Sequence, residues 1–136
     1  MEILLDEYCK TISIEANTMV DMAKKDILPA VATYIKELAK TAELAKGCGA
    51  DVSFETDMVK RLSELSAKMY KNLGTLEKAA SEAKSIGDIK KQANYYRDSV
   101  IPAMNELRAP ADEIESLVGE KYWPYPTYGA LLFYVM

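Results

Sequence analysis

The side chains that could carry out chemistry are few in this sequence of 136 residues, which contains no histidine. Without histidine the chain cannot form a Ser-His-Asp or Cys-His nucleophile, the Glu-x-x-His motifs of di-iron bundles or a His-ligated zinc site. The two cysteines, Cys9 and Cys48, lie far apart and form no C-x-x-C motif. Two isolated cysteines are typical of a reducing cytoplasm, where free cysteine packs like a small apolar residue.

Two short patterns look like catalytic motifs, but each has a simpler interpretation. Ser81 and Lys84 match the S-x-x-K spacing of some acyl-transfer enzymes, yet no second motif accompanies them, so we interpret the match as chance. Gly47 and Gly49 resemble part of a dinucleotide-binding loop, but they follow a predicted helix rather than a strand, and the third glycine is missing. They are instead typical of the end of a helix.

The segment 95–98 (YYRD) gathers two tyrosines, a cation and an acid within one helical turn. It could bind a small anion. The interpretation that we favour is that Tyr96 faces the core while Arg97 and Asp98 contact a neighbouring element. Because no other set of reactive groups converges, we predict no catalytic, cofactor-binding or metal-ligating residue in this chain.

Length and composition predict a single folded domain. A chain of 136 residues, 49% of them apolar, has enough material for a core. The formal net charge is -4, and no basic block is present, so neither nucleic acid nor an anionic membrane surface is an expected partner. No apolar run approaches the ~18 residues of a transmembrane span, and the first residues lack the features of a signal peptide.

Long amphipathic helices are the elements predicted to position these side chains. In residues 3–46, apolar side chains recur every three or four positions from Leu4 and Tyr8 to Leu38 and beyond, which is the repeat of one helix face. Such a helix is roughly 60 Å long, and it is stable only when other helices cover its apolar stripe. Pro29 lies inside it, so we expect the helix either to kink there or to stop and restart.

Two further helices are predicted, at residues 54–85 and 88–118. Their apolar residues also recur at helical spacing, and a glycine followed by a capping aspartate, Gly87 and Asp88, separates them. Pro102 lies in the third helix within VIPAM, a segment similar to the ILPAV of the first stretch. This similarity hints at matched curvature in the two helices.

The predicted fold is therefore all-α, with three long kinked helices in an antiparallel up-down-up bundle that forms one domain over residues 1–136. A count of four helices follows if Pro29 or Pro102 breaks its helix.

The last residues, 119–136, are predicted to form an extended tail rich in aromatic residues and proline. Each proline holds the residue before it in an extended conformation. The tail must dock, since it would otherwise expose a large apolar patch. It packs either along the same bundle or on another domain or subunit, and its candidate contact residues are Trp123, Tyr125, Tyr128, Phe133 and Tyr134.

Several segments together resemble one enzyme family. They are residues 7–24 (EYCKTISIEANTMVDMAK), 27–31 (ILPAV), 95–98 (YYRD), 102–104 (PAM) and 123–129 (WPYPTYG). Over essentially its whole length, the chain is similar to the C-terminal helical region of type III glutamine synthetases, the large bacterial form of the enzyme. The first and last of these segments are the specific ones.

The resemblance implies that the chain is a fragment of a larger cytoplasmic enzyme, which joins ammonia to glutamate using ATP and a divalent metal such as Mg. The family's catalytic residues lie upstream, so none is assigned here. The implied role is structural, namely packing on the upstream catalytic domain of the same polypeptide and on neighbouring subunits to help set a large ring assembly. The alternative is a free-standing helical module for protein–protein interaction. An independent small enzyme is the weakest hypothesis, because no catalytic set is found.

Overall fold

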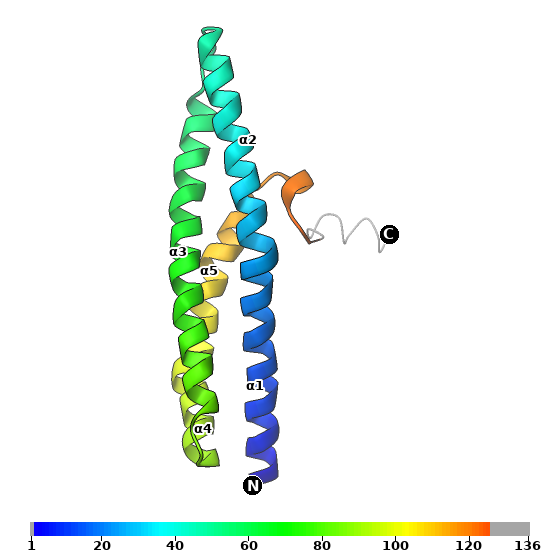
Figure 1. Cartoon of the computed structure of the whole chain (residues 1–136), viewed down its shortest axis with the longest axis vertical. Coiled ribbons are helices and arrows are strands. Elements are labelled where there is room, and N and C mark those ends of the chain that lie inside the picture. Colours follow the sequence, from blue (N-terminus) through cyan, green and yellow to red (C-terminus); the bar gives the residue numbers. More distant parts are fainter. Residues whose placement is uncertain (1, 126–136) are drawn as a thin grey trace.

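A computed structural model describes residues 2–125, which form a long helical rod (Figure 1). No strand occurs among these residues, which confirms the all-α prediction. No helix within them combines the length and the hydropathy that a membrane span requires. The elements in chain order are α1 (Glu2–Met22), the π-helical turn η1 (Ala23–Ile27), α2 (Leu28–Gly47), α3 (Ser53–Lys84), α4 (Ile89–Tyr95), the π-helical turn η2 (Tyr96–Val100), α5 (Ile101–Leu117) and the 3-10 turn η3 (Glu120–Tyr122).

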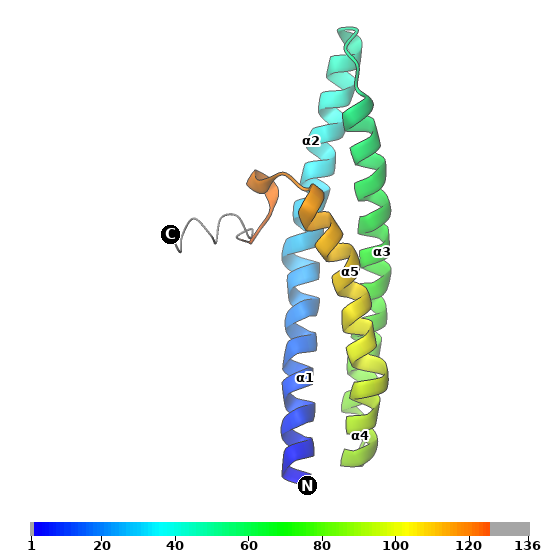
Figure 2. The same cartoon turned by 180° about the vertical axis from the view of Figure 1, so that it is seen from behind.

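The chain runs along the rod three times. α1 and α2 follow one another in one direction, α3 returns, and α4 and α5 run in the first direction again (Figure 1 and Figure 2). Because α5 ends beside the middle of the rod, α2 and α3 continue beyond it as a two-helix hairpin. The bundle therefore has three helices over one part of its length and two over the other.

A glycine ends α2 and a capping aspartate starts α4. After α2, Gly49 adopts a φ of 78°, a conformation that a residue with a side chain rarely adopts. The N–H of Ala50 then donates to the carbonyl of Ala45 at 3.1 Å, so one of the last carbonyls of α2 is satisfied. At the next turn Asp88 caps α4, as predicted, by accepting from the N–H of Lys91 at 3.1 Å.

Neither Pro29 nor Pro102 breaks its helix. Each proline is the second residue of an α-helix that directly continues a five-residue π-helical turn, η1 or η2. In η1 the N–H of Leu28 donates to the carbonyl of Ala23, five residues back, and the equivalent bond closes η2. The wider turn gives the proline ring room where a regular turn would clash with the preceding carbonyl. The similar segments ILPAV and VIPAM therefore fold in the same way.

The core runs along the inside of the bundle, and no polar or charged side chain is buried among residues 2–125. One predicted position is wrong, because Leu4 is 69% exposed and Leu5 packs against the core in its place. Counting back from the buried Ala16 and Cys9 in steps of three or four leads to Leu5, so Leu4 lies about 100° away from the buried face. The largest fully buried side chains are Leu62, Met69, Leu73, Leu76, Leu107, Ile114, Val31, Val100 and Pro110.

Candidate functional site

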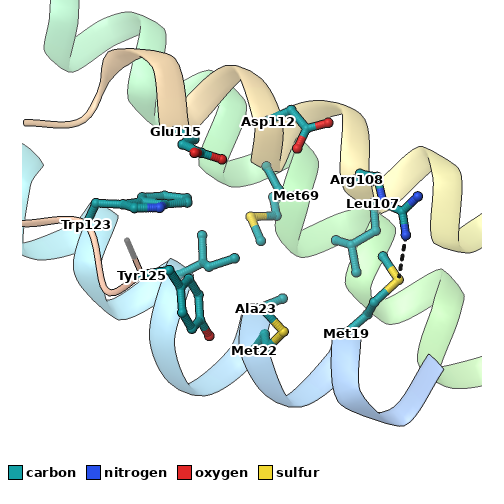
Figure 3. A pocket seen from close by; sticks show the side chains of 12 residues that line it. Met19, Met22, Ala23, Met69, Leu107, Arg108, Asp112, Glu115, Trp123 and Tyr125 are labelled. Atoms are coloured by element: carbon teal, nitrogen blue, oxygen red, sulfur yellow. Dashed lines mark hydrogen bonds between the residues drawn. The ribbon is translucent and has the colours of Figure 1, made fainter. Parts of the chain in front are cut away.

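A cavity of about 380 Å³ lies where η1 and the end of α1 face α3 and α5 (Figure 3). Residues that follow α5 form its remaining side. Two small side chains, Ala23 of η1 and Ala111 of α5, contribute little volume to its walls. The size falls at the lower end of the range for small-ligand pockets. The lining residues are Met19, Met22, Ala23, Ile27, Met69, Leu107, Arg108, Ala111, Asp112, Glu115, Trp123 and Tyr125.

The walls of this cavity are apolar, and its charged groups lie along α5. Three methionines, Met19, Met22 and Met69, supply flexible thioether side chains that adapt to the shape of a bound group. On the α5 side, Arg108 places Nη2 3.9 Å from the Sδ of Met19. The charged side chains on this side are exposed to solvent. The cavity is therefore suited to an apolar group rather than to an ion.

One side of the cavity is formed by residues 119–125, which we call the strap. Its far end is fixed by a hydrogen bond from the hydroxyl of Tyr125 to Oδ2 of Asp26, 2.6 Å long. Asp26 belongs to η1, so the π-helical turn that accommodates Pro29 also carries the acceptor for the strap. Burial, together with the hydrogen bond and negative charge of Asp26, raises the pKa of Tyr125 to about 12. The hydroxyl therefore keeps its proton and acts as a donor at neutral pH.

Aromatic contacts hold the rest of the strap. The rings of Tyr122 and Tyr34, on α2, lie 5.0 Å apart between centroids at an interplanar angle of 39°. Trp123 and Tyr125 make an edge-to-face contact with centroids 6.3 Å apart at 77°. The strap is thus attached to α2 at one end and to η1 at the other, and both Trp123 and Tyr125 face the cavity (Figure 3).

Comparison with known proteins places this rod in a family. A family model described as the glutamine synthetase C-terminal domain matches residues 1–46. A glutamine synthetase of Butyrivibrio fibrisolvens is 40% identical over 134 residues, and a type-3 glutamine synthetase of Dictyostelium discoideum is 31% identical over 138 residues. The alignments cover 97% of this chain in both cases. The chain belongs to the glutamine synthetase family. The chain spans only 19% of the length of these two relatives. The predicted relationship to the C-terminal region of type III glutamine synthetases is confirmed.

The cavity joins parts of this glutamine synthetase region that are distant in sequence. The family-model match, residues 1–46, includes Asp26 and the Met19 and Met22 walls, whereas Trp123 and Tyr125 lie beyond it. The hydrogen bond between Tyr125 and Asp26 spans 99 positions of the sequence. No local pattern marks Asp26 as its partner, so the sequence alone does not indicate this contact. The one available signal was an acidic side chain directly before the ILPAV segment.

The predicted contact residues divide into two groups. Trp123 and Tyr125 are half-buried and line the cavity, so the structure brings them together with η1 and α5. Tyr128, Phe133 and Tyr134 lie outside the described residues. The prediction that these five residues make contacts to another domain or subunit stays a prediction.

The YYRD segment in η2 and α4 is arranged differently from the interpretation favoured on sequence. Tyr96 is buried, as expected. Arg97 and Asp98, however, pair with each other, with Nε and Oδ1 2.8 Å apart, instead of contacting a neighbouring element. The contact to the neighbour comes from Tyr95, whose hydroxyl donates to Glu82 of α3 at 2.6 Å. The prediction failed because adjacent residues of opposite charge can pair directly at a solvated surface.

The described residues bring together no set of metal ligands, and the thiol of Cys9 is buried. Among residues 2–125, no three His, Cys, Asp or Glu side chains lie close enough to hold a metal ion. Cys9 is buried, and burial raises the pKa of its thiol, which lowers the fraction of nucleophilic thiolate at neutral pH. The cavity beside η1 is therefore lined by apolar groups and by charged side chains of α5, and its described lining contains no cysteine.

Proposed function

We propose that this chain is the C-terminal, non-catalytic helical domain of a type III glutamine synthetase, where it supports the assembly of the enzyme. The family-model description and the 19% share of its relatives' length support a domain within a larger polypeptide. The parent reaction would be the ATP-dependent ligation of ammonia to glutamate. ATP and a divalent metal such as Mg would bind to the upstream catalytic domain rather than to this rod.

The observation that carries the structural role is the distribution of exposed apolar side chains. On α1, Ile3 and Ile14 are 79% and 66% exposed, and an interval of eleven residues places them on nearly the same helix face. At the opposite end of the rod, Leu44 and Phe54 are 65% and 61% exposed near the hairpin of α2 and α3. Apolar groups at both ends suit a rod that packs against larger partners. The proposed partners are the upstream catalytic domain and neighbouring subunits.

The proposal includes a cytoplasmic location. Both cysteines, Cys9 and Cys48, are free thiols in the structure, which fits a reducing compartment.

The test uses the complete natural protein that contains this region. Ile3→Asp combined with Ile14→Asp should reduce the particle mass measured by light scattering, because two charges would then lie in the proposed interface. The matched control is Lys40→Asp, an acidic substitution at an exposed polar position of α2. An unchanged particle mass in the double variant, with intact helicity, would exclude this face from assembly.

The same preparation distinguishes the alternative role. Glutamine formation from glutamate, ammonia and ATP by the complete protein supports the domain proposal. A gene product that begins at Met1 and lacks this activity would instead indicate a free-standing helical module for protein–protein interaction, whose partner could then be sought with the α1 face as bait.

A further inference from the structure

The side of α1 that faces away from the core carries four exposed residues at heptad spacing. Ile3 and Ile14 are largely exposed, and two exposed charged residues, Glu7 and Lys10, lie between them. The steps of four, three and four residues keep these side chains within about 60° of one another around the helix axis. This surface, which we call the α1 outer face, therefore has an isoleucine at each end and two opposite charges at its centre.

The core lies on the other side of α1. Cys9 and Ala16 are buried there, roughly 140–160° around the helix axis from the α1 outer face. Lys10 forms an ion pair within the helix, with Nζ 3.0 Å from Oδ2 of Asp6, and its side chain is nevertheless 66% exposed. The α1 outer face can therefore contact a partner at the end of the rod where α1 begins (Figure 1).

The α1 outer face is complementary to itself. The midpoint between Ile3 and Ile14 in the sequence is also the midpoint between Glu7 and Lys10. When two copies of α1 pack antiparallel about this midpoint, Ile3 lies against the partner's Ile14. The two-fold axis repeats this contact at the other end. At the centre, Glu7 lies against the partner's Lys10, and this contact is also made twice.

We propose that the α1 outer face binds the same face of a second copy of this chain, with the two helices antiparallel. A parallel pairing would place Glu7 against the partner's Glu7 and Lys10 against the partner's Lys10, and like charges that face each other across a contact are unfavourable. In the antiparallel pairing the isoleucines bury apolar surface, whereas the charges fix the orientation and the register. The complementary charges thus identify the second copy as the partner.

The contact is short, so it adds to an assembly that other contacts also hold. From Ile3 to Ile14 the helix is roughly 17 Å long, and four side chains from each copy are far fewer than the roughly 20–30 residues a side of a standard interface. The inference rests on the proposed role of this region in assembly and names the partner of α1 within it. The experiment therefore uses the complete natural protein.

Charge reversal in separate chains tests the pairing. Glu7→Lys should lower the particle mass measured by light scattering at successive dilutions, because lysines would then face each other at both central contacts. Lys10→Glu should have the same effect, since glutamates would face each other. Co-expression of the two variants should restore the mass, because a chain of one kind then meets a chain of opposite charge. Each chain still carries like charges at positions 7 and 10, so contacts within one helix cannot explain the recovery.

Matched controls make the same reversals away from the α1 outer face. Glu15→Lys changes an exposed position of α1 that lies about 100° around the helix axis from this face. Lys40→Glu changes an exposed position of α2. The particle mass should stay that of the unmodified protein in both controls, alone and co-expressed. Far-UV circular dichroism of all variants verifies that the helices are intact.

Two results would overturn the proposal. A lower mass in both single variants that co-expression does not restore would show that the α1 outer face contacts a different surface, such as the catalytic domain, and the role in assembly would stand. An unchanged mass in both single variants would also exclude the pairing. The variant with Ile3→Asp and Ile14→Asp then separates the two proposals, because a lower mass leaves the role in assembly intact and an unchanged mass removes both.

Discussion

The two π-helical turns of this molecule have the same backbone but different surroundings. Both η1 and η2 are five residues long and directly precede a proline-containing segment, ILPAV or VIPAM. Each turn buries its first and last residues, which are Ala23 and Ile27 in η1 and Tyr96 and Val100 in η2. The first buried position is therefore alanine in one turn and tyrosine in the other. Tyr96 is a buried ring at η2, 2% exposed, whereas the small side chain of Ala23 lines the apolar cavity at η1.

The acidic residues of the two turns differ in the same way. Asp98 of η2 pairs with its neighbour Arg97 in solvent, and both side chains are more than 60% exposed. Asp26 of η1 instead accepts a hydrogen bond from Tyr125, far along the chain. The comparison shows that the same π-helical turn serves two purposes in this molecule. At η2 it accommodates a proline next to a buried tyrosine, whereas at η1 it borders the apolar cavity and anchors the strap.

The largest expected effect is at η2, where Tyr96 is 2% exposed. Tyr96→Ala should lower the free energy of unfolding by about 3–5 kcal/mol, because a buried aromatic side chain leaves a cavity in a packed core. Urea unfolding followed by circular dichroism measures the change. Tyr70→Ala is the control, since Tyr70 is 71% exposed, and its effect should stay within about 0.5 kcal/mol. Equal effects of the two substitutions would show that η2 is not tightly packed.

The second effect tests the cavity by filling it. Ala23→Leu should leave the free energy of unfolding unchanged or raise it by up to about 1 kcal/mol, because the added atoms enter an existing apolar space. Ala16→Leu, at a fully buried position of α1 that does not line the cavity, should instead lower it by about 1–3 kcal/mol through overpacking. A higher free energy of unfolding for Ala23→Leu and a lower one for Ala16→Leu would show that Ala23 borders an empty space and that Ala16 does not. Destabilisation of similar size at both would mean that residues outside the bundle already occupy the space.

Sequence periodicity predicted the helices well because it reports which faces are apolar. The stripe from Ile89 to Leu107 and the caps at Gly49 and Asp88 follow from local rules of spacing and turn chemistry. The cavity could not be predicted in this way, because Ala23 and Tyr96 count equally as apolar positions in a stripe. Volume, not polarity, separates them.

The π-helical turns and the strap could not be predicted from the sequence for other reasons. Pro29 allowed either a kink or a break, and the π-helical turn that resolves the choice depends on the surrounding helices as well as on the local sequence. The core position predicted at Leu4 is wrong because, at the end of a helix, the spacing of apolar residues does not fix the buried face to within one residue. The contact between Asp26 and Tyr125 is set by how α5 and the strap pack against α1 and η1, and nothing in either local sequence encodes it.

A smaller effect is expected from the hydroxyl of Tyr125. Tyr125→Phe should cost about 0.5–1.5 kcal/mol of local stability by removing the hydrogen bond to Asp26, and Trp123 should become more accessible to acrylamide. The unmodified chain should show the same release at alkaline pH. Because folding raises the pKa of Tyr125 from 10.0 to about 12, the contact is fully stabilising below pH 10 and is lost as the pH rises through 12. A Trp123 transition in this range that persists in the Phe variant would assign it to other groups.

The smallest effect separates the two aspartates. Asp98→Ala should leave the free energy of unfolding nearly unchanged, since an exposed ion pair contributes little, and the emission of Trp123 should not change. Asp26→Ala makes the same substitution at the other turn, where the loss of the acceptor for Tyr125 should free the strap and shift that emission to longer wavelength. Alanine replaces an exposed aspartate in a π-helical turn in both variants, so general effects on helix stability should largely cancel in their difference. A response of Trp123 to Asp26→Ala alone therefore isolates the strap contact. Equal responses would mean that the two turns are equivalent, and that the strap is held by its aromatic contacts without the help of η1.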